Sequence, residues 1–222
     1  YDVDENLKPN LKSIEKYLKE RIGIFLHMGY YGLPTNIDLE DTVKKLKNNK
    51  VIIAEDVTHT LFSKYKRFEE NDYYIASLRK WLGIPSGGFL IFKDSKIQTK
   101  LNVQYDFSNI REEALLLKGE YIKTNNKELK QIFLDMFKEA EIVLDEDIGP
   151  YAIDNVSLNI LNEVDIEELS KKRKENFLFL LKNMKGMEDI EPVFNKISDN
   201  ICPLFFPIYI KKERKKFREF LI

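Results

Sequence analysis

The sequence predicts an α/β protein built around a mostly parallel sheet, because short apolar segments alternate with helical ones. An apolar run at 22–26, a helical pattern at 38–47 and a second apolar run at 51–54 follow one another within about thirty residues. Such a strand–helix–strand unit makes its strands parallel and covers the sheet with helices. We therefore expect ligand-binding side chains at the carboxyl ends of these strands.

The remaining elements of the first half follow from local patterns. Apolar residues at helical spacing predict a further helix over 9–21. Two glycines and a proline make 27–36 a loop. The apolar run that begins after Asp72 is predicted to be a strand that delivers Ser77 and Lys80 at its exit, and a Gly-Gly turn precedes a further strand over 89–92.

From residue 109 onward the pattern changes to long helices with charged outer faces. A Gly-Pro pair at 149–150 breaks this pattern, and Asp165 is predicted to cap a helix over 165–184. A strand over 201–210 and the start of a helix over 213–222 follow. We expect a parallel-sheet domain over 1–105, and linking helices with a smaller α+β domain over 106–222.

Composition excludes several classes of protein. Of the 222 residues 43% are hydrophobic, and acidic and basic residues nearly cancel to a net charge of -1. This balance argues against nucleic acid as a partner, and the basic run at 171–174 is predicted to be a solvated helix face. Cys202 is the single cysteine, which is typical of a reducing, cytoplasmic compartment. No signal peptide or membrane-spanning segment is predicted.

The chain begins with Tyr1 and ends with Ile222 inside an amphipathic pattern. We therefore expect it to be part of a longer protein, with an open apolar sheet edge that favours association.

A lysine, an aspartate, a histidine and a serine follow predicted strands and together indicate a binding site for pyridoxal phosphate (PLP). Lys80 follows an apolar strand and supplies an amine for a Schiff base, which requires the unprotonated form. Asp56 ends a buried strand and would face the ring nitrogen. His59 lies three residues later, near the phenolic oxygen, and Ser77 would offer its hydroxyl to the phosphate.

Each of these residues also has a simpler interpretation. Lys80 alone would be an ordinary surface lysine, and Asp56 a helix or turn cap. Glu55 competes with Asp56, because strand alternation turns one of the two away. His59 taken singly is more often a buried histidine with satisfied hydrogen bonds.

Two further residues have weaker claims to the cofactor site. His27 ends the first predicted strand or lies at the surface, and Arg79 adds charge near the phosphate or is solvated. No metal site is predicted.

Three segments resemble the PLP-dependent aminotransferases of fold type I, and in particular the DegT-type, sugar-aminotransferase-like superfamily. They are Val51–His59, Ser77–Trp81 and Pro85–Gly88. The resemblance covers about residues 22 to 93. It implies that 1–105 is part of the PLP-binding large domain, that Lys80 is the Schiff-base lysine and moves a proton, and that Asp56, His59 and Ser77 bind the cofactor, with His27 and Arg79 as further candidates.

The sequence departs from this family in two ways. No small-residue phosphate loop or stacking aromatic ring is identifiable before residue 22, and the family's serine often lies farther from its lysine than Ser77 lies from Lys80.

The resemblance implies amino-group transfer from a small-molecule donor to a keto acceptor, with a nucleotide sugar as one candidate, in a homodimer. Two alternatives remain open: a non-catalytic fragment or degenerate relative that acts as a pairing module, and a PLP-dependent lyase or decarboxylase.

Overall fold

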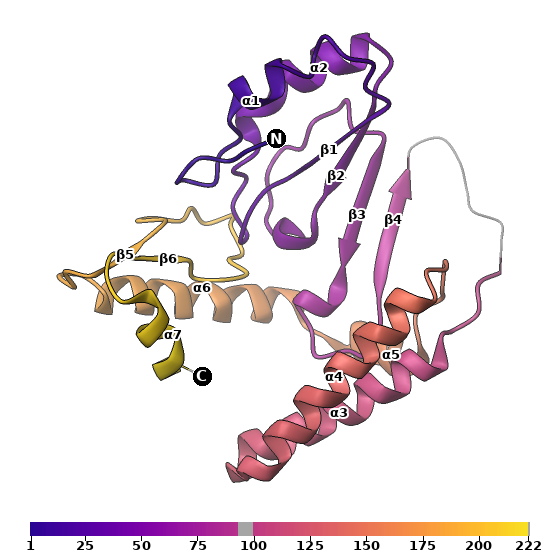
Figure 1. The fold of residues 1–222 in the computed structure, drawn as a ribbon, viewed down its shortest axis with the longest axis vertical. Coiled ribbons are helices and arrows are strands. Elements are labelled where there is room, and N and C mark those ends of the chain that lie inside the picture. The colour runs from indigo at the N-terminus through magenta and orange to yellow at the C-terminus, as the bar shows by residue number, and fades with distance from the viewer. Residues whose placement is uncertain (93–99, 222) are drawn as a thin grey trace. The chain divides into compact units, whose positions relative to one another are not determined.

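The computed structural model describes residues 1–92 and 100–221, and it divides the chain into two compact units (Figure 1). The first unit combines Tyr1–Ile75 with Asp165–Ile222, and the second consists of Ala76–Val164. The predicted domain boundary after residue 105 falls inside the second unit and stays a prediction. The end of the last predicted helix, at Ile222, lies outside the described residues.

The described part of the first unit begins with α1 (Leu11–Glu15), β1 (Ile24–Met28), α2 (Glu40–Asn48) and β2 (Ile52–Asp56). Its C-terminal segment contains α6 (Ile166–Asn183), β5 (Ile190–Pro192), β6 (Ile208–Ile210) and α7 (Arg214–Leu221). Strand β3 (Tyr73–Ser77) leads into the second unit, which contains β4 (Gly88–Phe92), α3 (Tyr105–Thr124), α4 (Lys127–Glu146) and α5 (Asn155–Glu163). Short 3₁₀ turns are η1 (Ile37–Leu39), η2 (Thr58–Thr60) and η3 (Leu78–Lys80).

The main sheet has the strand order β1-β2-β3-β4, and β1, β2 and β3 are parallel. Met28 of β1 pairs with Asp56 of β2, which pairs in turn with Ile75 of β3. Strands β5 and β6 form a separate antiparallel pair. The predicted α/β class with a mostly parallel sheet is therefore confirmed.

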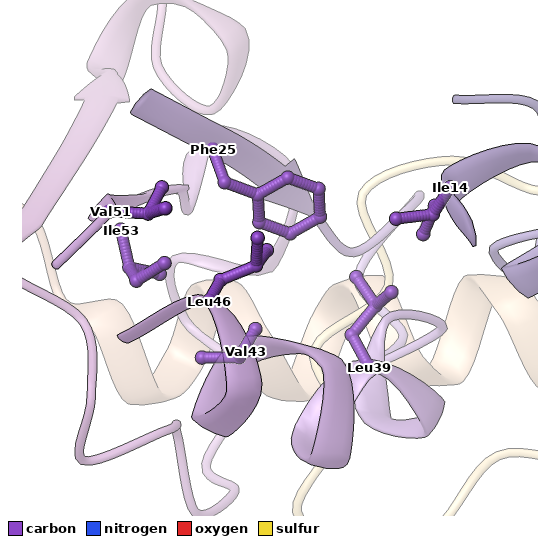
Figure 2. Packing of buried hydrophobic residues seen from close by; sticks show 7 residues of the cluster. All are labelled: Ile14, Phe25, Leu39, Val43, Leu46, Val51 and Ile53. Carbon is purple, nitrogen blue, oxygen red and sulfur yellow. The ribbon is translucent and has the colours of Figure 1, made fainter. Parts of the chain in front are cut away.

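Helix α2 covers one face of the β1–β2 pair (Figure 2). Val43 and Leu46 lie three residues apart and so share one side of the helix, where they meet Phe25 and Ile53. Ile53 and Val43 are fully buried, and each such side chain contributes about 1.5–3 kcal/mol to the stability of the fold.

The opposite face of the β1–β2 pair is apolar but exposed. Ile24, Leu26 and Ile52 are 64%, 52% and 39% exposed, and the register places Ile24 opposite Ile52. Asp56 lies on this same face, because residues 52, 54 and 56 of a strand point to one side.

Two predicted elements differ from the structure. Helix α1 ends at Glu15 rather than Arg21, and the chain continues in turns in which Tyr17 is 44% exposed and Leu18, only partly buried, packs against the core. The predicted strand at 201–210 is limited to β6. Its first part is a buried loop in which the Leu204 N–H donates to the Tyr31 carbonyl, and two prolines prevent a regular ladder there.

The predicted cap of α6 is confirmed, because the Asp165 carboxylate accepts hydrogen bonds from the N–H groups of Glu167 and Glu168, both at 2.9 Å. Within residues 1–92 and 100–221, every helix is too short or too polar to cross a membrane.

Candidate active site

Asp56 occupies the carboxyl end of β2 and is half-buried. One of its oxygens, Oδ1, accepts a hydrogen bond from the N–H of Thr58 at 2.8 Å, which starts the turn η2. The carboxylate therefore serves as a turn cap in this structure.

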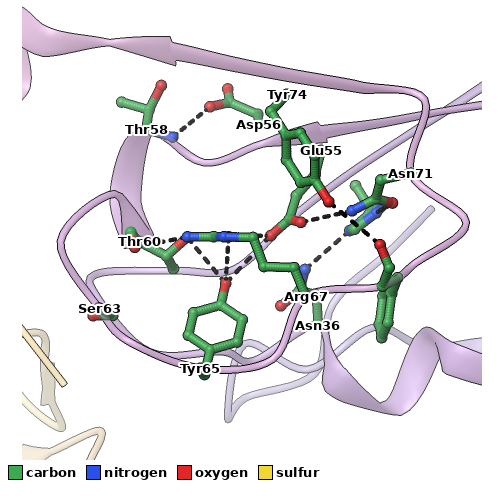
Figure 3. A network of polar contacts seen from close by, with 12 residues as sticks. Asn36, Glu55, Asp56, Thr58, Thr60, Ser63, Tyr65, Arg67, Asn71 and Tyr74 are labelled. Atoms are coloured by element: carbon green, nitrogen blue, oxygen red, sulfur yellow. Dashed lines mark hydrogen bonds and ion pairs between the residues drawn. The ribbon is translucent and has the colours of Figure 1, made fainter. Parts of the chain in front are cut away.

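Glu55, the competing carboxylate, points to the other face and lies in a buried polar network (Figure 3). It is 1% exposed and forms an ion pair with Arg67 at 2.5 Å. Its second oxygen accepts a hydrogen bond from the amide of Asn71 at 2.8 Å. These contacts occupy both oxygens, so Glu55 is a structural residue, and Asp56 stays the predicted cofactor carboxylate.

Arg67 connects this network to the loop that follows η2. Its guanidinium donates to the Tyr65 hydroxyl at 2.9 Å and to the Thr60 carbonyl at 3.0 Å. Burial, together with the negative charge of Glu55, raises the pKa of Tyr65 to about 12. The ion pair therefore fixes the course of the chain immediately after the turn that carries His59.

His27 belongs to the same network and is 1% exposed. Because Glu55 accepts from the Asn71 amide, the Asn71 carbonyl oxygen faces His27 Nε2 at 3.0 Å, and that nitrogen carries the proton. The other ring nitrogen accepts from Asn36 at 2.9 Å. The pKa of His27 is lowered, because the effect of burial outweighs the hydrogen bond with Asn71 and the charge of Glu55, which both favour the charged form. His27 is thus a neutral histidine with both nitrogens bonded.

His59 lies in η2 within a cluster of aromatic rings. Its ring stacks on Tyr31 with centroids 5.4 Å apart, and it makes edge-to-face contacts with Tyr30 and Phe205, whose ring centroids lie 6.2 Å and 6.0 Å from its own. The Tyr31 N–H donates to His59 Nδ1 at 3.4 Å, which favours the tautomer with the proton on Nε2. Phe205 lies more than a hundred residues from His59, and no sequence pattern links the two residues.

Ser77 and Lys80 lie in the second unit, where the chain leaves β3. Ser77 is the last residue of β3 and is half-buried, and Lys80 is the exposed last residue of η3. The turn is closed by a hydrogen bond from the Leu78 N–H to the Gly87 carbonyl at 3.1 Å. The predicted Gly-Gly turn is therefore hydrogen-bonded to the turn that carries Lys80.

Gly87 and Gly88 are required at this point for different reasons. Gly87 has φ of +129°, a conformation that disfavours other residues. A Cβ atom on Gly88 would lie 2.8 Å from the carbonyl oxygen of Ala76. The pair thus allows the return strand β4 to start directly against the end of β3.

Arg79 turns toward the long helices of the second unit. It donates to the Glu141 carboxylate at 3.1 Å, and its guanidinium lies 5.2 Å from the centre of the Phe107 ring. Arg111 donates to the same Glu141 oxygen at 3.0 Å. Glu141 lies 62 residues from Arg79 and 30 residues from Arg111, and no local pattern in the sequence marks partners at such separations.

The sequence matches no protein-family model, and no curated protein matches it. Solved structures share its fold. The aminotransferase PseC of Helicobacter pylori, involved in the biosynthesis of pseudoaminic acid, aligns with a TM-score of 0.55 and 14% identity over 97% of this chain and 52% of that chain. AtS13 of Actinomadura melliaura aligns with a TM-score of 0.54 and 17% identity, over 98% and 56%.

A third structure, the aminotransferase TlmJ of Streptoalloteichus hindustanus, aligns with a TM-score of 0.53 and 16% identity over 94% of this chain and 52% of that chain. These likenesses confirm the predicted aminotransferase-like fold. The chain spans about half the length of the structures it matches.

Proposed function

We propose that this chain is part of a PLP-dependent aminotransferase in which Lys80 binds the cofactor as a Schiff base. The observation that carries the proposal is an exposed primary amine on a fixed turn at the end of a strand, in a chain with an aminotransferase fold. We further propose an amino donor and a keto acceptor as substrates, with a nucleotide sugar as a candidate acceptor, and a homodimer as the assembly.

The donor groups of the chain suit this cofactor chemically. Bound PLP supplies an electron-accepting ring that stabilises negative charge on a substrate carbon. In the proposal, Asp56 would hold its negative charge against the ring nitrogen, His59 would donate a hydrogen bond to the phenolic oxygen, and Ser77 would offer its hydroxyl to the phosphate. Lys80 would hold the cofactor and move a proton at the substrate carbon.

We propose that His27 and Arg79 support the structure around the site. Both nitrogens of His27 are bonded to asparagines, so we assign it to the packing beneath β1 and β2. Arg79 is bonded to Glu141, so we assign it to the turn that carries Lys80.

Covalent trapping tests the proposal. The protein is incubated with PLP, reduced with borohydride, digested and mapped by mass spectrometry. We expect saturable modification of Lys80, loss of this modification in Lys80→Arg, and its retention in Lys118→Arg, which replaces an exposed lysine on α3. Equal labelling of surface lysines, without preference for Lys80, would remove the assignment.

A further inference from the structure

The turn that carries Lys80 is short, and contacts from outside the turn help to hold its conformation. Turn η3 has three residues, and its backbone is closed by bonds from Trp81 N–H to the Leu78 carbonyl at 3.0 Å and from Leu78 N–H to the Gly87 carbonyl at 3.1 Å. Trp81 is 4% exposed while Lys80 is exposed. A fixed lysine therefore needs support from outside the turn.

This support comes from one carboxylate shared by two arginines. Oε1 of Glu141 on α4 accepts from Arg79, which directly precedes Lys80, and from Arg111 on α3. Arg111 also donates through Nε to the Pro85 carbonyl at 2.9 Å, on the far side of the same loop. The two guanidinium groups lie over the Phe107 ring at 5.2 Å and 5.6 Å.

The charges explain why the carboxylate matters. Burial and the nearby positive charge of Arg79 lower the pKa of Arg111, whereas Glu141 opposes this change. Without Glu141, two partly buried guanidinium groups would face each other with their repulsion uncompensated. The carboxylate therefore holds the loop at both ends, through Arg79 before Lys80 and through Arg111 at Pro85.

We propose that Glu141 and Arg111 are positioning residues for Lys80, acting through Arg79 and Pro85. This inference rests on the proposed function of Lys80. Glu141 is 52% exposed, so its ion pairs contribute little to the stability of the fold as a whole. Its loss should therefore loosen the turn that carries Lys80 without unfolding the protein. This result would distinguish a positioning role of Glu141 from a general contribution to stability.

The single tryptophan of the chain, Trp81, reports on this turn directly. We compare Glu141→Gln with Glu139→Gln, which makes the same change at an exposed residue of the same helix. With far-UV circular dichroism unchanged, we expect acrylamide quenching of Trp81 fluorescence to rise about twofold to threefold in Glu141→Gln alone. Glu141→Asp, which keeps the charge, should recover part of the protection.

Trapping of PLP on Lys80 gives the second measurement. At subsaturating PLP, we expect the fraction of Lys80 trapped to fall about threefold in Glu141→Gln, with Glu139→Gln at the wild-type level. If both variants match the wild type in quenching and in trapping, the inference is wrong. If the wild type itself shows no trapping on Lys80, the proposed function fails, and the quenching comparison alone decides whether Glu141 holds the turn.

Discussion

At the level of single residues, Glu55 and Asp56 are adjacent in sequence but have opposite environments. Glu55 is buried with Arg67 and Asn71, whereas Asp56 is half-buried on the other face. A one-residue step in a strand reverses the direction of the side chain, so neighbouring carboxylates acquire different tasks. Glu55 therefore matters for stability, and Asp56 is left for the proposed cofactor.

The buried Glu55 carboxylate depends on Arg67 for its countercharge. We expect Arg67→Met to lower the free energy of unfolding by about 3 kcal/mol, because it leaves a buried charge unpaired. Urea denaturation measures this change. The control, Lys66→Met, removes a lysine whose side chain is 81% exposed in a surface pair with Glu69, and should cost less than about 1 kcal/mol. Equal costs for the two variants would contradict the importance of the buried pair.

At the level of elements, the N-terminus of α5 is tied to the loop that precedes β4. The Asp154 carboxylate caps the helix by accepting from Ser157 N–H at 2.8 Å, and it also accepts from the hydroxyls of Ser86 and Ser157, both at 2.5 Å. Asp154 is 5% exposed. This cap therefore joins two segments far apart in the chain, unlike the exposed cap Asp165 of α6.

We expect Asp154→Ala to lower the free energy of unfolding at pH 7 by about 2–3 kcal/mol, because several bonds to one charged group are lost. Asp165→Ala, the matched control, should cost about 1 kcal/mol, the usual value for an exposed cap. Urea titrations of the two variants give the comparison. A cost for Asp154→Ala no larger than that of Asp165→Ala would show that its bonds to Ser86 contribute nothing.

The effect of Asp154 should also depend on pH. Burial alone would raise the pKa of Asp154, but the hydrogen bonds from Ser157 and Ser86 outweigh it and lower the pKa. The stability gained from a lowered carboxylate pKa is complete above the unfolded pKa of about 4 and is lost as pH falls through the folded pKa. The difference between wild type and Asp154→Ala should therefore be constant from pH 7 to about pH 5 and shrink below about pH 4.

The sequence predicted those elements whose signals are local. The strands β1 and β2, the helix α2 and the cap Asp165 follow from apolar spacing and capping chemistry within a few residues. The segment before β6 was misjudged because its apolar residues are buried as a loop against Ser63 and Tyr31.

The residues of the candidate site also differ in whether a local sequence pattern locates them. The strand end that carries Asp56 and the turn after β3 that carries Lys80 could be located from short patterns, because a strand and its exit are continuous in sequence. Glu141, which contacts Arg79, and Phe205, which contacts His59, could not be located, because the approach of their segments is decided by tertiary packing. A sequence without aligned relatives holds no local trace of such pairs.

At the level of the whole molecule, the apolar face of β1 and β2 is exposed and open to a partner. Strand β1 is at the edge of the sheet in the described residues, and its outward side chains Ile24 and Leu26 are more than half exposed. Parallel sheets are normally covered on both faces. This face also carries Asp56, so a polypeptide that covered it would enclose the carboxylate of the proposed cofactor site.

We therefore expect the protein to self-associate through this face, in line with the proposed homodimer, and Leu26→Lys to weaken the association about tenfold or more. Excluding one leucine side chain from water contributes about 1.5–3 kcal/mol, which corresponds to this change in dissociation constant. Sedimentation velocity over a range of concentrations measures it. Leu116→Lys, a matched change at a 68% exposed leucine of α3, should leave the association unaltered.

A monomer at all concentrations, or equal weakening by both substitutions, would show that the open sheet face is not the contact surface. Because Leu26 is itself half exposed, its replacement should cost little folding stability, so weaker association could not be attributed to unfolding.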